Sequence, residues 1–247
     1  MKANQLSHFV LLGTGIIMFG CTSADRSLSI KTDNDFQVYQ LAIGTADDDV
    51  VVSSIRAIAK YGEGYQITLS FIRNNYHKNS GLFAAKQLMS YAARPDYLKD
   101  LSTLLEEIDY KKVGAGEQLK NAILIRSIII SQLFISNPKK YGNDYIDAIP
   151  SILKASNYRI GFQDTIMSDN LELCTRHGLL SNAAIIQLFP HFMKCLKEAF
   201  HSSEIEESVR CLEKLTGVIV SDRKVIFDKI QTEKLFSDWF KGKDKLQ

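Results

Sequence analysis

Residues 47–62 read DDDVVVSSIRAIAKYG, and the spacing of their apolar and small side chains is typical of an amphipathic helix. The side chains that share one helix face are Val50, Ser54, Ala57, Ile58 and Tyr61. An acidic start and a glycine stop bound this pattern, as they bound many helices. The residues therefore predict a helix from about residue 48 to residue 61.

A second apolar run follows after only a few residues, at Ile67, Leu69, Phe71 and Ile72. A gap this short is typical of an antiparallel partner helix. Together the two runs resemble one HEAT repeat, whose first helix carries an acidic residue, Val, Ala, Ala-Leu, an apolar residue and Gly at this spacing. Val51 stands where the family usually has Arg. The resemblance implies paired helices that stack into an α-solenoid.

A proline pattern occurs three times further along the chain. PDYLK at 95–99, PSILK at 150–154 and PHFMK at 190–194 share the form Pro-x-apolar-apolar-Lys. The last two segments are preceded by Ala148-Ile149 and Leu188-Phe189, and they are similar to the second helix of HEAT repeats, where a proline sits in the early turns. Proline is tolerated there because a first-turn N–H has no partner within the helix.

The sequence thus predicts an all-α fold, an α-solenoid of about five irregular HEAT-like antiparallel helix pairs. The pairs are expected at about 47–74, 80–108, 115–157, 160–201 and 204–241. A short helix with Phe36, Tyr39 and Ile43 on one face precedes them, capped by Asp33 or Asn34 and ended by Gly44. Each pair would bury its apolar stripe only against its neighbours, giving a curved, right-handed array with one concave face.

The N-terminus has the pattern of a secretory signal peptide. A basic start, an apolar stretch over 9–19 that is too short to span a bilayer, and Gly20 before Cys21 form this pattern. The last four residues, Met18-Phe19-Gly20-Cys21, resemble the lipobox of bacterial lipoproteins. The resemblance implies that residues 1–20 are removed and that Cys21 carries a lipid anchor. The alternative is an ordinary signal peptide followed by a coincidental cysteine.

Residues 21–35 are expected to form the lipidated cysteine and a flexible tether, because they are mostly polar or charged. The folded domain would then span 36–247. Thr22 is not the Asp that resembles an inner-membrane retention signal. We therefore expect a bacterial cell-envelope location, with the outer membrane facing the periplasm favoured in a Gram-negative host. No cofactor is expected beyond the covalent lipid.

Composition excludes several function classes. The 247 residues are 45% hydrophobic and 23% charged, which are ordinary globular values. A net charge of +2 is too small to indicate nucleic acid binding. The segment 119–135 is apolar nearly all round, but Arg126 lies in its middle. A central helix of the stack fits this segment better than a transmembrane helix does.

Three cysteines follow the lipobox, at Cys174, Cys195 and Cys211. If the helices turn near residues 180 and 203, Cys195 and Cys211 lie at similar heights on adjacent helices, so they are the preferred disulfide. The alternative is that all three are small buried apolar residues. Cys174 with His177, and His191 with Cys195, have zinc-ligand spacing, but the two pairs would lie roughly 12 Å apart. We therefore expect no metal site.

Catalytic motifs are incomplete. Ser151 and Lys154 match Ser-x-x-Lys, and residues 168–170 match Ser-Asp-Asn, two elements of penicillin-recognising serine enzymes. The third element, Lys-Thr-Gly, and any sign of a central sheet are missing. No catalytic residue is therefore expected. The aromatic residues considered for a binding surface are Tyr141, Tyr145, Tyr158 and Trp239; aromatic stripes at helical spacing are usually core, so none is assigned to a site.

These observations predict a membrane-anchored, non-enzymatic lipoprotein that presents a helical-repeat surface for protein–protein interaction in the bacterial envelope. Its expected partner is another envelope protein. One alternative is a periplasmic immunity or inhibitor lipoprotein that neutralises a toxin, since that function also needs only a surface. Another is an envelope enzyme, against which the lack of a nucleophile, metal set or acid–base pair counts.

Overall fold

The computed structural model describes residues 8–12, 15–19, 33–44, 47–59, 61, 63–160, 166–220, 226 and 228–244. At the N-terminus, β1 (His8–Leu12) and β2 (Gly15–Phe19) form an antiparallel hairpin. Both strands lie within the predicted signal peptide. The lipobox cysteine, Cys21, and the predicted tether as far as residue 32 lie outside the described residues. Lipidation of Cys21 therefore stays a prediction.

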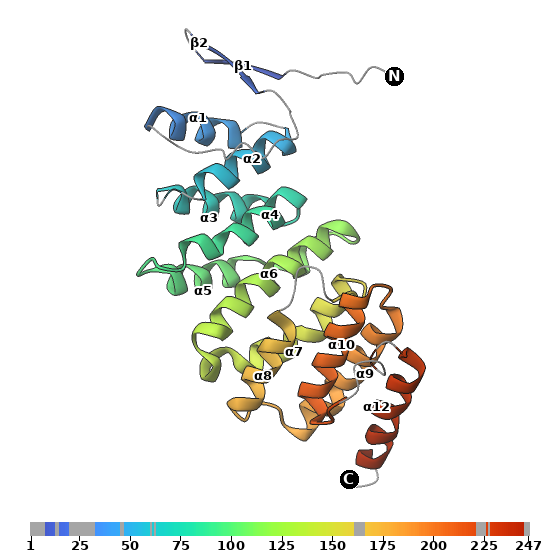
Figure 1. The fold of residues 1–247 in the computed structure, drawn as a ribbon. Coiled ribbons are helices and arrows are strands. Elements are labelled where there is room, and N and C mark those ends of the chain that lie inside the picture. The colour runs from blue at the N-terminus through green and yellow to red at the C-terminus, as the bar shows by residue number, and fades with distance from the viewer. Residues whose placement is uncertain are drawn as a thin grey trace, which may run out of the picture.

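From residue 33 onward, every regular element in the described residues is a helix, which confirms the all-α fold (Figure 1). The α-helices are α1 (Asp33–Ile43), α2 (Asp48–Ile58), α3 (Gly64–Asn75), α4 (Asn79–Gln87), α5 (Tyr97–Glu107), α6 (Glu117–Ser136), α7 (Pro138–Ala155), α8 (Ile166–Arg176), α9 (Asn182–Glu198), α10 (Ser202–Thr216) and α12 (Lys229–Asp244). Two short 3-10 helices are η1 (Leu88–Tyr91) and η2 (Tyr110–Lys112).

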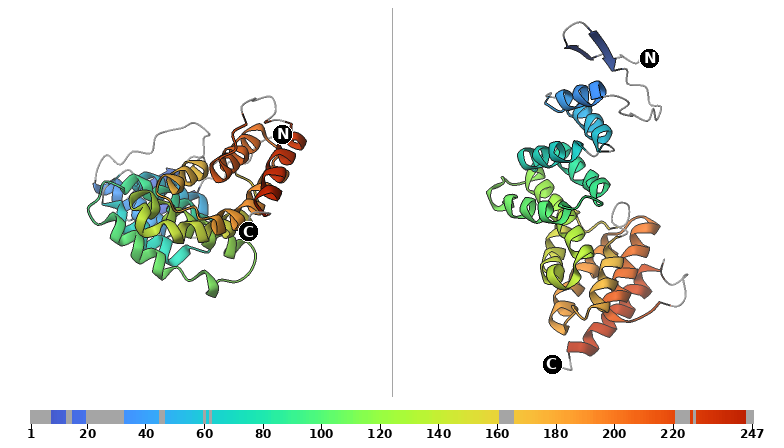
Figure 2. Two further views of the ribbon diagram at one scale, coloured as in Figure 1. Left: turned by 90° about the horizontal axis from the view of Figure 1, so that it is seen from below. Right: turned by 90° about the vertical axis from the view of Figure 1, so that its left-hand side faces the viewer.

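The helices pack in a repeat-like way. The helices α2/α3, α4/α5, α6/α7, α8/α9 and α10/α12 lie in the five predicted ranges or extend up to three residues beyond them. The helices of α2/α3, α6/α7 and α10/α12 pack on each other, whereas α4 packs on α2, α3 and α6, and α8 packs on α6, α7 and α10. Helices two places apart along the chain also pack together, as α2 does on α4, α4 on α6, α7 on α9 and α8 on α10. Figure 2 shows the resulting stack, with the N-terminal helices at one end and the C-terminal helices at the other.

The first pair shows how local sequence sets the helix boundaries. Asp47 caps α2 by accepting hydrogen bonds from the backbone N–H groups of Asp49 and Val50, at 3.0 and 3.2 Å. Helix α3 begins at Gly64, where a β-carbon would clash with the carbonyl oxygen of Ile58. Glycine is therefore required where α3 turns back closely against the end of α2.

The predicted early-turn position of the prolines is wrong. Pro150 and Pro190 lie inside α7 and α9, and Pro95 precedes α5. The reason is that both helices begin well before the proline pattern. Asn137 caps α7 by accepting from the N–H of Lys140 at 3.1 Å, and Pro138 occupies the first turn instead.

Two hydrophobic cores fill the stack, and α6 belongs to both. The N-terminal core, which extends from Ile43 to Leu133, takes Ile125 and Ile129 from α6. The C-terminal core, which extends from Ile130 to Phe236, takes Ile130 and Phe134 from another face of the same helix. This sharing explains why α6 is apolar nearly all round.

Helix α6 is the one helix among the described residues that is long and apolar enough to span a membrane, judged by length and composition alone. Half of its apolar window is buried between other helices. The structure therefore agrees with a central core helix, since the buried core helix of a soluble protein meets the same length and composition criteria.

Candidate functional site

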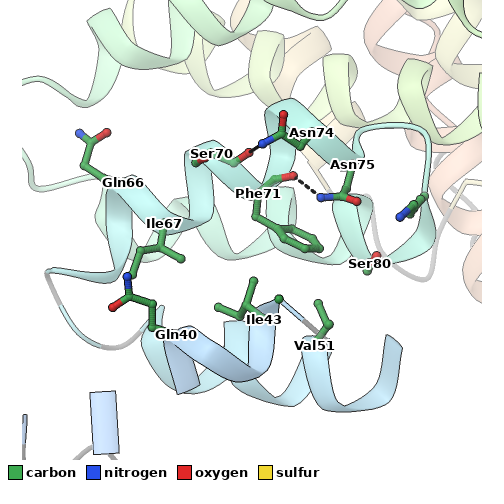
Figure 3. Close-up of a pocket in the computed structure, with 12 residues that line it drawn as sticks. Gln40, Ile43, Val51, Gln66, Ile67, Ser70, Phe71, Asn74, Asn75 and Ser80 are labelled. Atoms are coloured by element: carbon green, nitrogen blue, oxygen red, sulfur yellow. Dashed lines mark hydrogen bonds between the residues drawn. The ribbon is translucent and has the colours of Figure 1, made fainter. Parts of the chain in front are cut away.

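Two hollows open on the surface of the described helices. The smaller, about 690 Å³, lies between α1 and α3 (Figure 3). The larger, about 970 Å³, lies between the end of α5 with η2 on one side and α7 on the other, above α6. We call the larger hollow the central groove. It has the size of a typical ligand site and lies where the two cores meet.

The floor of the central groove is a face of α6. Ile123, Arg126 and Ser127, together with Ile130 one turn on, recur at the spacing that places side chains on one helix face. Leu105 from α5 and Ile152 from α7 extend the apolar part of the surface. The floor is thus mostly apolar, with one cation in it.

Arg126, in the floor, holds one wall of the central groove in place. Its guanidinium donates hydrogen bonds to the carbonyl oxygens of Leu105 and Ile108, at 2.6 and 2.9 Å. It also lies 5.2 Å from the ring centroid of Tyr110 in η2. Carbonyls at a helix C-terminus lack partners within the helix, so Arg126 satisfies the end of α5 and holds η2 in place. These contacts explain why a charged residue, Arg126, lies in the middle of the apolar helix α6.

The opposite wall is the exposed side of α7. Asp144, Asp147 and Ser151 lie along it, all exposed to solvent. Beside them, the Lys140 ammonium lies 4.7 Å from the Tyr141 ring centroid. Hydrogen bonding from Lys140, and from Ser102 across the groove, lowers the pKa of the Tyr141 hydroxyl despite its partial burial.

Both walls carry charges of both signs. The α7 wall has Lys140 beside Asp144 and Asp147, and the α5–η2 wall has acidic and basic residues, Glu106, Glu107, Asp109, Lys111 and Lys112. A mostly apolar floor between polar walls that each carry both signs of charge suits a protein segment with an apolar face and charged flanks.

The two serine motifs face different surroundings. Ser151 lines the central groove, whereas Ser168 is buried on α8, where its backbone N–H donates to the Glu207 carboxylate at 3.1 Å. Burial lowers the pKa of the His191 imidazole, and the positive charges of Lys154 and Lys194 lower it further. The structure therefore gives Ser151 no partner from the Ser-Asp-Asn segment among these contacts.

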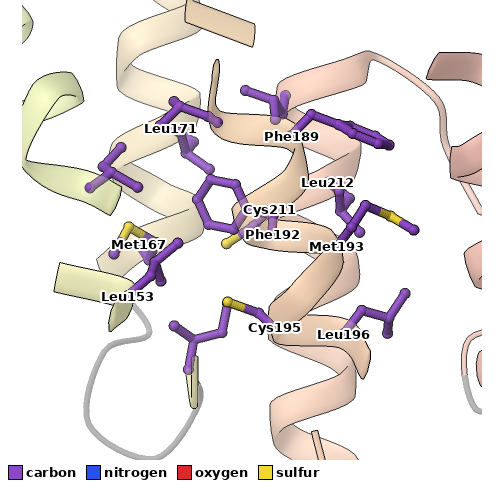
Figure 4. Close-up of a cluster of buried hydrophobic side chains, with 14 of the residues drawn as sticks. Leu153, Met167, Leu171, Phe189, Phe192, Met193, Cys195, Leu196, Cys211 and Leu212 are labelled. Carbon is purple, nitrogen blue, oxygen red and sulfur yellow. The ribbon is translucent and has the colours of Figure 1, made fainter. Parts of the chain in front are cut away.

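The three cysteines of the helical body are buried and present as free thiols. Cys195 on α9 and Cys211 on α10 lie on helices that pack together, within the cluster that Figure 4 shows. Burial raises the pKa of Cys195 to about 12, and burial together with the negative charge of the neighbouring Glu207 raises the pKa of Cys211. The predicted Cys195–Cys211 disulfide stays a prediction, and thiols held in the protonated form react slowly.

The candidate zinc ligands do not come together. Cys174 is buried, with a pKa raised to about 12 by burial, whereas His177 is exposed at the end of α8. His191 instead stacks on the ring of Tyr158, with centroids 6.1 Å apart. Among the described residues, no group of three metal-ligating side chains is found.

Of the aromatic residues considered, only Tyr141 lines the central groove. Tyr145 is core and stacks on Phe134, with centroids 4.7 Å apart. Trp239 packs against Phe189 at the C-terminal end. The sequence pointed to Arg126 as exceptional, but neither its carbonyl partners nor Tyr110 could be identified from spacing.

Comparison of the chain with protein-family models, with curated proteins and with solved structures finds no match.

Proposed function

We propose that this protein is a membrane-anchored, non-enzymatic lipoprotein that uses a HEAT-like α-solenoid surface to bind another protein of the bacterial envelope. Cys21 would carry the lipid, and the tether would hold the helical body at a distance from the membrane. The lipobox-like sequence at residues 18–21 supports the anchor. The repeat-like packing of successive helices supports the solenoid.

The observation that carries the docking function is the central groove. Its apolar floor lies on α6, and Arg126 fixes its α5–η2 wall through two hydrogen bonds. A preformed groove reduces the ordering cost of binding, so a partner segment gains affinity without rearranging the protein. Charged side chains of both signs on the two walls would pair with charged flanks of that segment.

Site-specific photo-crosslinking in living cells tests this proposal. A photoreactive amino acid in place of Ser151 lies in the central groove, and the same amino acid in place of Asn143 lies on the exposed surface of the same helix outside it. We expect one envelope protein to be captured from position 151 and not from position 143. A secreted toxin as the captured partner would identify an inhibitor. Equal capture at both positions, or none, would contradict docking in this groove.

The anchor is tested separately with Cys21→Ser. We expect the unmodified protein to fractionate with membranes and to incorporate labelled palmitate, and the variant to become soluble and unlabelled. Membrane association that persists in the variant would show that Cys21 is not the anchor.

A further inference from the structure

The smaller hollow, between α1 and α3, has a chemistry of its own. Helix α1 packs along α2, and its Gln40 and Ile43 face α3 across the hollow (Figure 3). Amide side chains are frequent in its lining, at Gln40, Gln66, Asn74 and Asn75. We call this hollow the amide groove.

Helix α3 presents two parallel rows to the amide groove. Gln66, Ser70 and Asn74 form a polar row, in which successive side chains are four residues apart. Four residues of helix rise about 6 Å, and groups on one side of an extended peptide repeat every 6.6 to 6.8 Å, so the two periods nearly match. The polar row can therefore meet successive peptide groups along one side of an extended chain.

The second row supplies an apolar surface. Ile67 and Phe71 are half-buried on α3, and Ile43 and Val51 face them from α1 and α2. An apolar recess formed by three aliphatic side chains and one aromatic ring suits an apolar peptide side chain. The row ends in Asn75.

Two of the amides are held in fixed orientations. The Nδ2 atoms of Asn74 and Asn75 donate to the carbonyl oxygens of Ser70 and Phe71, each at 3.0 Å (Figure 3). A primary amide has two N–H donors and a carbonyl acceptor. One donor of each is used within α3, and the second N–H and the oxygen have the same chemistry as a peptide group, with which they can pair.

Charge in the lining is confined to one end. Lys78, which caps α4, is the one charged residue among those that line the amide groove in the described part of the chain. A charged group in the middle of a ligand would therefore find no counter-ion there, whereas a carboxylate near Asn75 would meet the Lys78 ammonium.

We propose that the amide groove binds an extended peptide of about four residues, apolar or uncharged in its middle and carrying a carboxylate at the Lys78 end. The length follows from the rise of α3 between Gln66 and Asn75, about 13 Å. This site is separate from the central groove and does not depend on docking there, so crosslinking from position 151 and peptide binding here can fail independently.

Side-chain amide signals in ¹⁵N NMR spectra report directly on this groove. The protein is produced from the full-length sequence with Cys21→Ser. The probes are three N-acetylated peptides: Ala-Leu-Ala-Asp amide, Ala-Leu-Ala-Ala with a free C-terminus, and Ala-Leu-Ala-Ala amide. We expect the NH₂ signals of Gln66, Asn74 and Asn75 to shift when either of the first two peptides is added. The third peptide should bind with about tenfold lower affinity. The comparison of the first two distinguishes a side-chain carboxylate from a terminal one.

Variants make the test specific. Gln66→Ala combined with Asn74→Ala is expected to weaken peptide binding about tenfold, and Lys78→Ala to remove the preference for a carboxylate. Asn143→Ala, which removes an exposed amide on α7, is the matched control and should leave binding unchanged. Unshifted amide signals with all three peptides, or shifts caused by the disaccharide of N-acetylglucosamine and not by the peptides, would overturn the proposal.

Discussion

The Arg126 side chain donates hydrogen bonds to two backbone carbonyl oxygens at the end of α5. Replacing it with Met keeps the apolar stem and removes both hydrogen bonds to the end of α5. We expect Arg126→Met to lower the free energy of unfolding by about 1–3 kcal/mol, because two carbonyls lose their charged partner. Urea denaturation measures the change. Arg126→Lys is the control, since it keeps the charge without the two-pronged geometry and should fall between Met and the natural residue.

Glu207 is a buried carboxyl with a raised pKa. Burial is the main cause, and the negative charge of Asp169 adds to it. Hydrogen bonds from Ser168 and the positive charge of Arg210 lower the pKa, but by less. A raised pKa means that the folded protein holds this proton more tightly than the unfolded chain does. Stability from this group is therefore present at low pH and is lost as pH rises through the folded-state pKa.

Glu207→Gln removes this ionisation while keeping an oxygen for the Ser168 N–H. We expect the variant to have a higher urea midpoint than the natural protein at pH 7, and the advantage to disappear toward pH 4. Glu106→Gln, on the exposed surface of α5, is the control and should have the same urea midpoint as the natural protein at both pH values. An advantage for Glu207→Gln that is equal at both pH values would contradict the titration of Glu207.

At the level of the elements, the turn between α2 and α3 depends on Gly64. Gly64→Ala places a β-carbon against the Ile58 carbonyl oxygen, a backbone atom that cannot move aside cheaply. We expect a loss of about 1–3 kcal/mol in the free energy of unfolding. Gly242→Ala is the control in α12, where a β-carbon meets nothing within 4 Å and helix propensity should give a gain of about 0.5–1 kcal/mol. Circular dichroism during thermal unfolding compares the two.

The elements were largely predictable because their signals are local. Asp47, with the apolar period after it, marks the start of α2 in the sequence itself, but α2 ends at Ile58, before the predicted end at residue 61, and the predicted stop, Gly62, lies outside the described residues. The proline pattern misled because Pro-x-apolar-apolar-Lys fits a first turn and a mid-helix position equally. The caps that start α7 and α9, Asn137 and Ser181, lie outside that pattern.

The grooves could not be predicted in the same way. The central groove exists because α5, η2 and α7 flank one face of α6, and residues as far apart as Ser102 and Ser151 line it. Helix periodicity gives the face of each helix and says nothing about the angle at which two helices cross. Arg126 was visible as an anomaly in an apolar segment, but its partners depend on that crossing.

Over the whole molecule, α6 couples the two cores. Ile129, fully buried in the N-terminal core, lies next to Ile130 of the C-terminal core on the same helix. Trp239, the single tryptophan, packs against the C-terminal core. We expect Ile129→Ala, which costs about 2–5 kcal/mol, to lower the urea midpoint reported by Trp239 fluorescence as much as the midpoint reported by circular dichroism. Separate transitions would show that the halves unfold independently.

Leu105 and Tyr141 are packed against both cores, and both line the central groove. The groove therefore lies across the joint between the halves of the array. A segment bound in the groove would restrict motion between the two halves, since it would contact the α5–η2 side and the α7 side at once. In mechanical terms, an occupied groove should make the helical array stiffer at this joint.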